Sequence, residues 1–297
     1  MWSSDATRLA DGLLARCAFG PSAAAVTCAV SGGADSLALL VLAARAGLAV
    51  TAVHVDHGLR PGSAAEAGVV AAAAEAVGAA FRAETVTVAR GPNLEARARA
   101  ARYGVLPAGV LTGHTADDQA ETVLLNLLRG AGVPGMAGMR VAGHPLLALR
   151  RAETVALCCA VGLTPVADPS NDDPAHLRNR VRHELVPMLR ELAGRDVAAL
   201  LARQAALVRD DDDLLDALAA GLDPTDARAL AEAPVPLARR AVRRWLTPEL
   251  AGYPPAADAV ARVLAVAAGA ATGCDVAGGV RVERHHQRLT VRRAPVA

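Results

Sequence analysis

The sequence predicts an α/β protein in which a doubly wound parallel sheet is followed by a smaller, mainly helical second domain. Two observations carry this prediction. In the first half, short runs rich in Val and Ala alternate with stretches of helical periodicity, the pattern of parallel strands joined by crossover helices. From residue 174 onward the chain changes to helical stretches rich in Arg, Leu and Ala. The 297 residues suffice for two domains, which we expect at 1–195 and 196–297.

Each expected strand is a short run that is apolar on both faces, as a sheet covered by helices on both sides requires. The strands are expected at residues 25–30, 49–55, 81–88, 109–111 and 145–149. Between them, the spacing of apolar residues predicts helices. The helices are expected at residues 35–46, 63–77, 93–106, 116–128 and 152–161. Near the end, residues 278–291 alternate Val or Leu with Arg and His, which is typical of a strand.

The composition excludes several classes of enzyme. All 31 basic residues are Arg, and the chain contains no Lys. A Walker-type phosphate loop, a protein-kinase site and a Schiff-base enzyme each need a Lys, so these mechanisms are excluded. The absence of HExxH and Gly-x-Ser-x-Gly motifs argues against zinc proteases and α/β-hydrolases. Hydrophobic residues make up 53% of the chain and charged residues 21%, which is typical of a globular protein.

We expect a cytoplasmic protein without a membrane span. The five cysteines form no CxxC pair, so we expect neither a disulfide framework nor a thiolate zinc site, and a reducing compartment fits. Asp5, Arg8 and Asp11 lie where the apolar core of a secretory signal would have to be. The longest uncharged run, residues 17–34, contains Pro21 and two adjacent glycines, so it is not expected to cross a bilayer.

Charge is distributed unevenly along the second half of the chain. Residues 196–232 carry nine acids against three arginines, and residues 239–297 carry ten arginines against four acids. The acidic run 210–213 is expected on a solvent-facing helix. The basic end suggests a polyanionic partner, although a solvated surface explains it equally well. Four arginines of this end fall along one stripe of an expected helix, a plausible phosphate-tracking surface: Arg239, Arg240, Arg243 and Arg244.

The segment Ser31-Gly32-Gly33-Ala34-Asp35-Ser36 lies between the first strand and the first helix of the sheet. Ligands of open parallel sheets bind at the carboxyl ends of strands, where this segment lies. Its glycines let backbone N–H groups approach an anion, the following helix adds a favourable dipole, and Asp35 is suited to hold Mg²⁺ against phosphates. Taken alone, the segment is equally consistent with an ordinary strand-to-helix turn.

A group of acids begins the helix expected at 116–128. Asp118 and Glu121 lie three residues apart on one face, with Asp117 beside them. This helix follows a neighbouring strand, so we expect its start near the 31–36 loop, where acids would bind Mg²⁺ or orient a nucleophile. Acids that stabilise a helix N-terminus are the alternative.

The loop resembles the PP-loop of the ATP pyrophosphatases, which cleave ATP between the α and β phosphates and need no Lys in the loop. Further segments narrow the resemblance to the tRNA(Ile)-lysidine synthase family, with matching order and spacing across residues 24–190. These segments are His54-Val55-Asp56-His57-Gly58-Leu59-Arg60, residues 93–103, Thr112-Gly113-His114-Thr115-Ala116-Asp117-Asp118 with residues 119–130, Asp168-Pro169-Ser170-Asn171, and Arg178-Asn179-Arg180-Val181-Arg182-His183-Glu184.

The resemblance implies a ligase that uses ATP to adenylate the wobble cytidine of tRNA(Ile) with a CAU anticodon and then joins free lysine to it. For catalysis it implies Asp35 and Asp118, with Mg²⁺, and it implies Arg178 and Arg182 as groups that stabilise charge. ATP is expected on Ser31, Gly32, Gly33, Ala34, Asp35, Ser36, Asp56 and His57. Contacts to tRNA are expected from Arg97, Arg102, Arg239, Arg243 and Arg244. A plain solvated surface remains the alternative for the last group and for Arg178 and Arg182.

Other functions within the same fold class remain open at this stage. A tRNA thiolase would use a cysteine pair or an iron–sulfur cluster, whereas Cys158 and Cys159 are adjacent rather than spaced as ligands. A small-molecule amidating ligase leaves the basic end unexplained, and a nucleotide sensor needs no catalysis. One departure from the family is His144, which stands where its members usually have Arg before the Pro-Leu-Leu step, so the resemblance carries no phosphate contact to this position.

Overall fold

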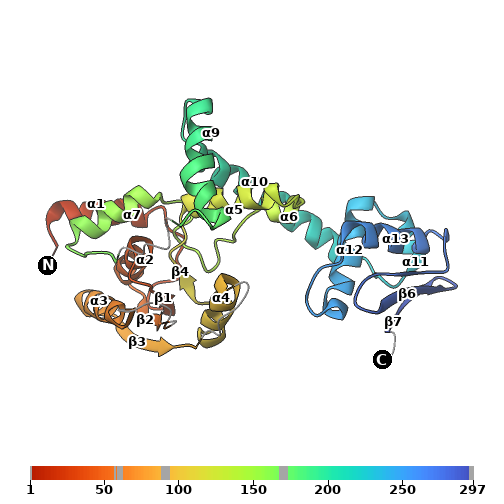
Figure 1. The fold of residues 1–297 in the computed structure, drawn as a ribbon, viewed down its shortest axis with the longest axis horizontal. Coiled ribbons are helices and arrows are strands. Elements are labelled where there is room, and N and C mark those ends of the chain that lie inside the picture. The colour runs from red at the N-terminus through yellow and green to blue at the C-terminus, as the bar shows by residue number, and fades with distance from the viewer. Residues whose placement is uncertain (1, 57, 59–62, 88–93, 167–172, 294–297) are drawn as a thin grey trace. The chain divides into compact units, whose positions relative to one another are not determined.

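The computed structural model describes residues 2–56, 58, 63–87, 94–166 and 173–293 (Figure 1). The chain divides into two compact units, Met1–Val208 and Arg209–Ala297. The long helix α10 (Val197–Ala220) contains this division. A domain boundary after residue 195 stays a prediction. Within the described residues, the helices are all too short or too polar to cross a bilayer.

The first unit contains a four-stranded parallel sheet in the order β3-β2-β1-β4. Its strands are β1 (Ala25–Ala29), β2 (Ala49–Asp56), β3 (Ala80–Thr85) and β4 (Leu111–Thr112). Helices α2 (Ala34–Arg45) and α3 (Ser63–Ala76) pack beside each other on one face, and α4 (Leu94–Val105) crosses back over the other (Figure 1). The predicted doubly wound sheet is confirmed. Because the strand order reverses between β1 and β4, the loops that follow these two strands meet at one edge.

Helix α2 is the centre of the first core. All of its residues from Ser36 to Ala43 are buried, and Leu37, Leu39, Leu40 and Leu42 are fully enclosed. The sheet covers one side of α2, while α1 (Ser4–Leu14) and α7 (Arg151–Ala160) pack on other sides. Burying a Leu side chain contributes about 1.5–3 kcal/mol, so this helix is firmly anchored. Its first turn, which carries the partly buried Asp35, is therefore firmly positioned by the buried turns that follow it.

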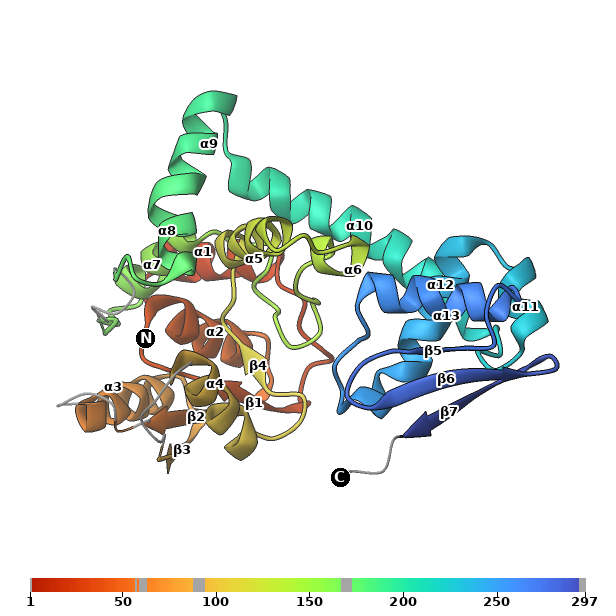
Figure 2. The same cartoon turned by 45° about the vertical axis from the view of Figure 1, so that its right-hand side comes forward.

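The remaining elements of the first unit follow the sheet. They are α5 (Ala116–Leu128), α6 (Val133–Met136), α8 (Leu177–Arg180), the π-helix η2 (Val181–Leu185) and α9 (Val186–Ala193). A small second core joins α5 to this last segment through Leu124, Leu125, Val181 and Val186. Figure 2 shows α5, α8 and α9 from a second side.

Two expectations for the strands were wrong in detail. Residues 145–149 form turns rather than a strand: Pro145 has no N–H to give to a ladder, and the Leu149 N–H bonds back to the Leu146 carbonyl. The buried side chains of Leu146 and Leu149 account for the apolar run. Strand β3 is not apolar on both faces, because it is the edge strand and Phe81 is 38% exposed.

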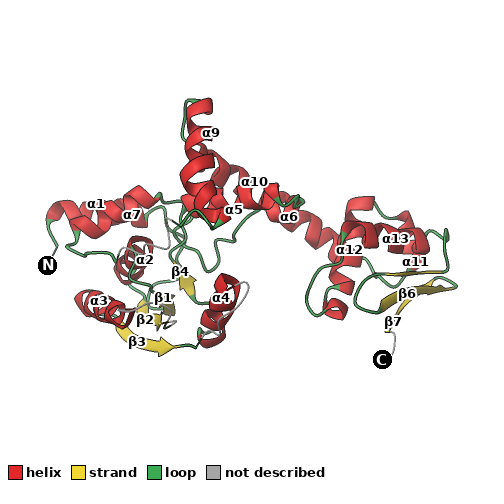
Figure 3. Cartoon of the chain, in the orientation of Figure 1, coloured by secondary structure: helices red, strands yellow, loops and turns green. Residues whose placement is uncertain are grey.

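The second unit is mainly helical, as predicted, with a small antiparallel sheet at its end (Figure 3). Its elements are α11 (Ala227–Glu232), α12 (Val235–Leu246), η3 (Pro248–Leu250), α13 (Ala257–Ala267), β5 (Gly273–Asp275), β6 (Val280–His285) and β7 (Arg288–Arg293). The strand expected at 278–291 is a hairpin of β6 and β7, with Val282 and Leu289 in the core.

The acidic run 210–213 is not wholly solvent-facing. Asp210, Asp211 and Asp213 are exposed, but Asp212 is buried and its Oδ1 accepts a hydrogen bond of 2.6 Å from Arg240 Nη2. Arg240 also donates to Asp216, so this arginine of α12 faces the acids of α10. The two oppositely charged parts of the second half are thus partly paired with each other.

Candidate active site

The loop from Ser31 to Ser36 connects β1 to α2 and is closed by its own hydroxyl groups. The Ser31 N–H donates to Ser36 Oγ at 3.2 Å, and Ser36 Oγ donates to the Gly33 carbonyl at 2.8 Å. Gly32 has a φ of +92°, and a Cβ there would lie 3.1 Å from Cγ2 of Val166, so the position suits only glycine. Gly33 is the N-cap of α2 and has no side chain to cap the helix. A helix that begins in this way can bind an anion through its first backbone N–H groups.

The chain that leaves β4 passes directly against this loop. A Cβ on Gly113 would lie 2.4 Å from the carbonyl oxygen of Asp35, so only glycine permits this approach. Helix α5 begins three residues later, with Thr115 as its N-cap. Its first acids therefore lie beside the 31–36 loop, as the order of the elements predicts. The same contact brings His114 to the edge of the site.

Six side chains from four parts of the chain meet here, and we call them the ion cluster. Three are acids and three are arginines, and they come from α2, α5, α7 and the α8–η2 segment. The ion cluster consists of Asp35, Asp118, Glu121, Arg151, Arg178 and Arg182. Glu121 and Asp118 lie deepest, since their side chains are only 2% and 9% exposed.

Arg151 joins the acid of the 31–36 loop to the acids of α5. Its Nε donates to Asp35 Oδ2 at 3.1 Å, and its Nη2 donates to Asp118 Oδ1 at 2.9 Å. Its Nη1 lies 3.5 Å from Glu121 Oε1. The hydroxyl of Thr154, one turn further along α7, donates to the other oxygen of Asp35. Helix α7 thus fixes the position of the Asp35 carboxylate through two side chains.

Arg178 and Arg182 bond to the same acids from the α8–η2 segment. Arg178 donates from Nε to Glu121 Oε2 at 2.8 Å and from Nη2 to Asp118 Oδ1 at 3.2 Å. Arg182 donates from Nε to Glu121 Oε1 at 2.6 Å and from Nη2 to Glu121 Oε2 at 3.1 Å. Arg182 lies in the π-helix η2. Such helices are rare in proteins, and those that occur are often found at functional sites.

The electrostatics of the two predicted acids differ. Burial acts to raise the pKa of Asp118, but the charge of Arg151, the Thr115 N–H and the charge of Arg178 outweigh it, so the pKa is lowered. At Asp35 burial dominates, and the pKa is raised despite the hydrogen bond from Thr154 and the charge of Arg151. Burial also acts to lower the pKa of Arg151, but the charges of the neighbouring acids outweigh it and raise the pKa.

The predicted catalytic residues thus lie together. Several residues predicted to contact ATP or tRNA lie elsewhere in the unit or outside the described residues. Asp56 is at the carboxyl end of β2, where its Oδ1 accepts from the Gly58 N–H. His57, residues 168–171 and the side chain of Arg102 lie outside the described residues. The Nε and Nη2 atoms of Arg97 are buried, and they have no hydrogen-bond partner in the part of the chain that the structure describes.

Sequence reasoning missed Arg151 and Thr154, and it placed Glu121 among the acids that bind Mg²⁺ or orient a nucleophile without making it a predicted catalytic residue. The spacing of Asp118 and Glu121 on one helix face was a usable signal for Glu121. Nothing in the sequence pointed to Arg151 and Thr154, because they reach the site only through the packing of α7 on α2.

A pair of imidazoles borders the site. Thr112 Oγ1 lies 2.7 Å from His114 Nδ1 and 3.0 Å from His144 Nδ1, and the two rings are 4.8 Å apart. Because a hydroxyl has one proton, at least one of the two imidazoles carries its hydrogen on Nδ1 and donates it to Thr112. His144, which stands where the resembling family usually has Arg, is therefore linked to His114 through one hydroxyl.

In the second unit, the arginines of α12 do not form a uniform stripe. Arg239, Arg243 and Arg244 are exposed, although Arg244 also donates to the Ala219 carbonyl at 3.1 Å. Arg240 is taken up by the acids of α10, as described above. Three positions on this helix therefore remain open to a polyanion.

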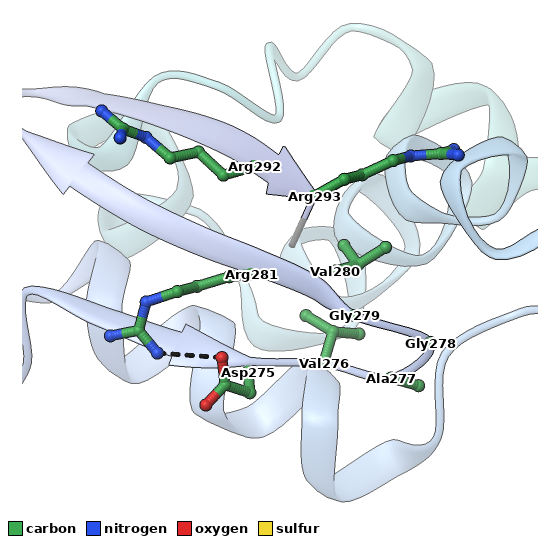
Figure 4. Close-up of a pocket in the computed structure, with 9 residues that line it drawn as sticks. All are labelled: Asp275, Val276, Ala277, Gly278, Gly279, Val280, Arg281, Arg292 and Arg293. Atoms are coloured by element: carbon green, nitrogen blue, oxygen red, sulfur yellow. Dashed lines mark hydrogen bonds and ion pairs between the residues drawn. The ribbon is translucent and has the colours of Figure 1, made fainter. Parts of the chain in front are cut away.

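A hollow of about 380 Å³ lies at the turn between β5 and β6 (Figure 4). Its cationic side chains are Arg281, Arg292 and Arg293. Arg281 pairs with Asp275 at 2.9 Å, and the other two pair with Glu283 and Glu249. Because each guanidinium already has a carboxylate partner, this hollow offers little excess positive charge to an anion.

Comparisons with known proteins agree with this architecture. A family model described as a PP-loop domain matches residues 6–189, and one described as a TilS substrate binding domain matches residues 226–290. Among solved structures, the chain is similar to the U34-tRNA thiolase NcsA from Methanococcus maripaludis with its [4Fe-4S] cluster. That similarity has a TM-score of 0.52 at 17% identity and covers 69% of this chain and 79% of the other, so it supports the fold alone.

Curated relatives are much more similar in sequence. A tRNA(Ile)-lysidine synthase from Nocardia farcinica is 44% identical over 295 residues, which covers 92% of this chain and 93% of the relative. Enzymes of the same name from Rhodococcus erythropolis and Mycolicibacterium paratuberculosis are 46% and 48% identical, over 74% and 73% of this chain and 73% of each relative. The identity extends through both units, and the chain belongs to the tRNA(Ile)-lysidine synthase family.

Proposed function

We propose that this protein is a ligase that uses ATP to form lysidine on tRNA(Ile). The observation that carries the proposal is the ion cluster, which joins the phosphate-binding loop to a buried acid pair in a chain of this family. A cluster that links the two is suited to a reaction in which a nucleotide and a second, cationic substrate must be held together. Holding two reactants in one geometry supplies much of the rate enhancement of such reactions.

The chemistry we propose has two steps. In the first, O2 of the wobble cytidine in a CAU anticodon attacks the α-phosphorus of ATP, and pyrophosphate leaves. In the second, the amine of free lysine attacks C2, loses a proton, and expels AMP together with the former O2. Adenylation makes O2 a good leaving group. We assign the ATP phosphates to the backbone and hydroxyl groups from Ser31 to Ser36, with Arg178 and Arg182 stabilising the charge that develops on them.

The residues of the site suit Mg²⁺ that is bound chiefly by phosphates. Magnesium usually takes one or two carboxylates together with substrate phosphates rather than a complete protein cage. Asp35 and Asp118 supply such carboxylates, and Arg151 bonds to both of them. Among the described residues, no three His, Cys, Asp or Glu side chains form a metal-binding group of their own. We propose Asp35 and Asp118 as the ligands; the ion would neutralise charge on the phosphates.

Lysine binding is assigned to the deepest acids. Asp118 and Glu121 are the buried carboxylates of the ion cluster, and they lie one helical turn apart on α5. An ammonium group is a strong donor that such acids are suited to hold. The tRNA is assigned to the open arginines of α12, with Arg97 and Arg102 of α4 as further contacts.

The proposal is tested by pyrophosphate release from ATP by the purified protein. The reaction would contain tRNA(Ile) transcript with a CAU anticodon and, in separate assays, each of the standard amino acids. We expect release that depends on the transcript and incorporation of label only from lysine. A transcript in which uridine replaces the wobble cytidine is the matched control and should give neither. Incorporation of a different amino acid, or turnover without tRNA, would contradict the assigned substrates.

Replacing Arg243 and Arg244 together with Ala should weaken tRNA binding and reduce its dependence on salt. Removing a single phosphate-binding arginine lowers the slope of log K against log salt by about one unit. The affinity for ATP should stay unchanged, because these residues lie in the second unit. Filter binding at several salt concentrations measures both quantities. Arg228→Ala, which removes an exposed arginine of α11 that pairs with Glu232, is the control. An unchanged slope in the double variant would remove α12 from the interface.

A further inference from the structure

The acid pair that we assign to lysine is fully occupied by groups of the protein itself. Asp118 Oδ1 accepts from Arg151, Arg178 and Arg182, and Oδ2 accepts from the backbone and hydroxyl of Thr115. Both oxygens of Glu121 accept from arginines as well. Each carboxylate oxygen has about two acceptor positions, so this arrangement leaves little capacity for an ammonium group.

The charge of the ion cluster is also balanced. Three guanidinium groups face three carboxylates, which gives no net charge. A neutral cluster has no electrostatic attraction for the cation of lysine. If Arg178 and Arg182 were bonded elsewhere, Arg151 alone would face the three acids, and the side chains of the cluster would carry a charge of −2, part of which the Mg²⁺ proposed on Asp35 and Asp118 would offset. Glu121, which has no part in the proposed metal site, would lose its bonds to both of these arginines. The affinity of this site for a cation therefore depends on where these two arginines are bonded.

The same two arginines are those that we assign to the ATP phosphates. Arg178 and Arg182 each bond to the acids through Nε and Nη2, so a phosphate that binds this same edge of the guanidinium group must displace the acids from it. Arg178 and Arg182 come from one short segment, residues 177–185, whereas Arg151 comes from α7, which packs on the buried helix α2. The pair can therefore exchange partners together while Arg151 stays with the acids.

We propose that ATP binding draws Arg178 and Arg182 from Asp118 and Glu121 onto the phosphates and thereby opens the lysine site. This inference rests on the proposed function. Nucleotide and lysine then bind with positive coupling, and lysine has low affinity before the nucleotide is present. Lysine is therefore bound tightly only after ATP, which activates the cytidine, is in place. By thermodynamic linkage, lysine must tighten nucleotide binding by the same factor.

The coupling is measured on the full-length chain with lysine, Mg²⁺ and α,β-methylene ATP, which resists cleavage between the α and β phosphates. Equilibrium dialysis of labelled lysine should give a dissociation constant at least about tenfold lower with the nucleotide analogue than without it. The reciprocal titration should show lysine tightening the analogue by the same factor. The inference would be overturned if the dissociation constant of lysine changed by less than twofold with the analogue, and that of the analogue by less than twofold with lysine.

Variants separate this exchange from other sources of coupling. Arg178→Ala with Arg182→Ala should bind lysine tightly without nucleotide and lose the coupling. Arg182→Gln, a smaller change, should show the same trend if the double variant does not fold. Arg180→Ala is the matched control, because Arg180 lies on the same segment but pairs with the exposed Glu184; it should keep full coupling. Full coupling in Arg182→Gln would overturn the inference. Lysidine formation, assayed with tRNA on the wild-type preparation, distinguishes the failures: lysidine formed without coupling removes only this inference, whereas no lysidine removes the proposed function itself.

Discussion

Replacement of Asp118 by Asn is expected to abolish tRNA-dependent pyrophosphate release, with a loss in kcat of about 10³-fold. The carboxylate is buried, accepts from three arginines and from the N-cap of α5, and lies beside the acid of the 31–36 loop. An amide in its place removes one negative charge and leaves three guanidinium groups facing two acids. The charges that position the substrates are then wrong, although the fold should survive, because α5 remains packed through Leu124 and Leu125.

The neighbouring acid gives a matched control. Asp117 lies one residue earlier on α5, but its carboxylate accepts from Arg150 and from the Arg151 N–H rather than from the side chains of the ion cluster. Asp117→Asn should therefore retain most of the activity. Single-turnover assays of both variants, with circular dichroism to establish folding, make the comparison. Full activity in a folded Asp118→Asn enzyme would exclude the role assigned to this residue.

Asp35→Ala is expected to cause a loss of similar size, about 10³-fold in turnover, while nucleotide binding persists. Asp35 is the acid of the 31–36 loop, and α7 holds its carboxylate through Arg151 and Thr154. Truncation removes the proposed metal ligand and leaves the backbone groups of the loop in place. A nucleotide sensor without catalysis would instead show altered binding and no turnover to lose. Pyrophosphate release and binding of labelled ATP, measured on the same preparation, separate the two cases.

The control for this variant is Asp11 of α1, whose partner lies at the other end of α2. Asp11 accepts two hydrogen bonds from Arg45 in the last turn of α2, and both groups are well exposed. Exposed ion pairs contribute little to stability, so Asp11→Ala should leave both activity and folding unchanged. A comparable loss in both variants would mean that activity is lost with any change to the contacts of α2, and the role assigned to Asp35 would fall.

The parallel sheet could be predicted because strands such as 25–30 and 49–55 are apolar runs in a regular alternation with helices. Residues 145–149 show the limit of that reasoning. Their apolar character reports burial, and burial alone does not distinguish a strand from a packed turn; Pro145 was the only local sign of the turn. The exposure of the edge strand β3 could have been read from Arg82 and Glu84, which interrupt its apolar residues.

The candidate site could be predicted in part for a related reason. Asp35 and Asp118 lie in motifs at the ends of strands that are neighbours in a doubly wound sheet, so their proximity followed from the order of the elements. Arg151 belongs to no recognisable motif, and its contacts depend on how α7 packs on α2. That Arg178 and Arg182 bond to the acid pair depends on three-dimensional charge balance, which a linear pattern does not contain.

The burial of α2 has a consequence for which parts of the protein can fluctuate. A helix enclosed on every side opens only when the whole unit unfolds, so its amides belong to the slowest-exchanging class and report global stability. The segment 177–185 is held by Val181 and by the ion pairs of Arg178 and Arg182, so ligands that take over those ion pairs should lower the free energy at which it opens locally. The part of the site formed by α2 therefore opens only when the whole unit unfolds, whereas the part formed by the segment 177–185 can move locally when ligands bind. We therefore expect α2 to supply the fixed geometry on which specificity depends, and the segment 177–185 to supply the response to ligands.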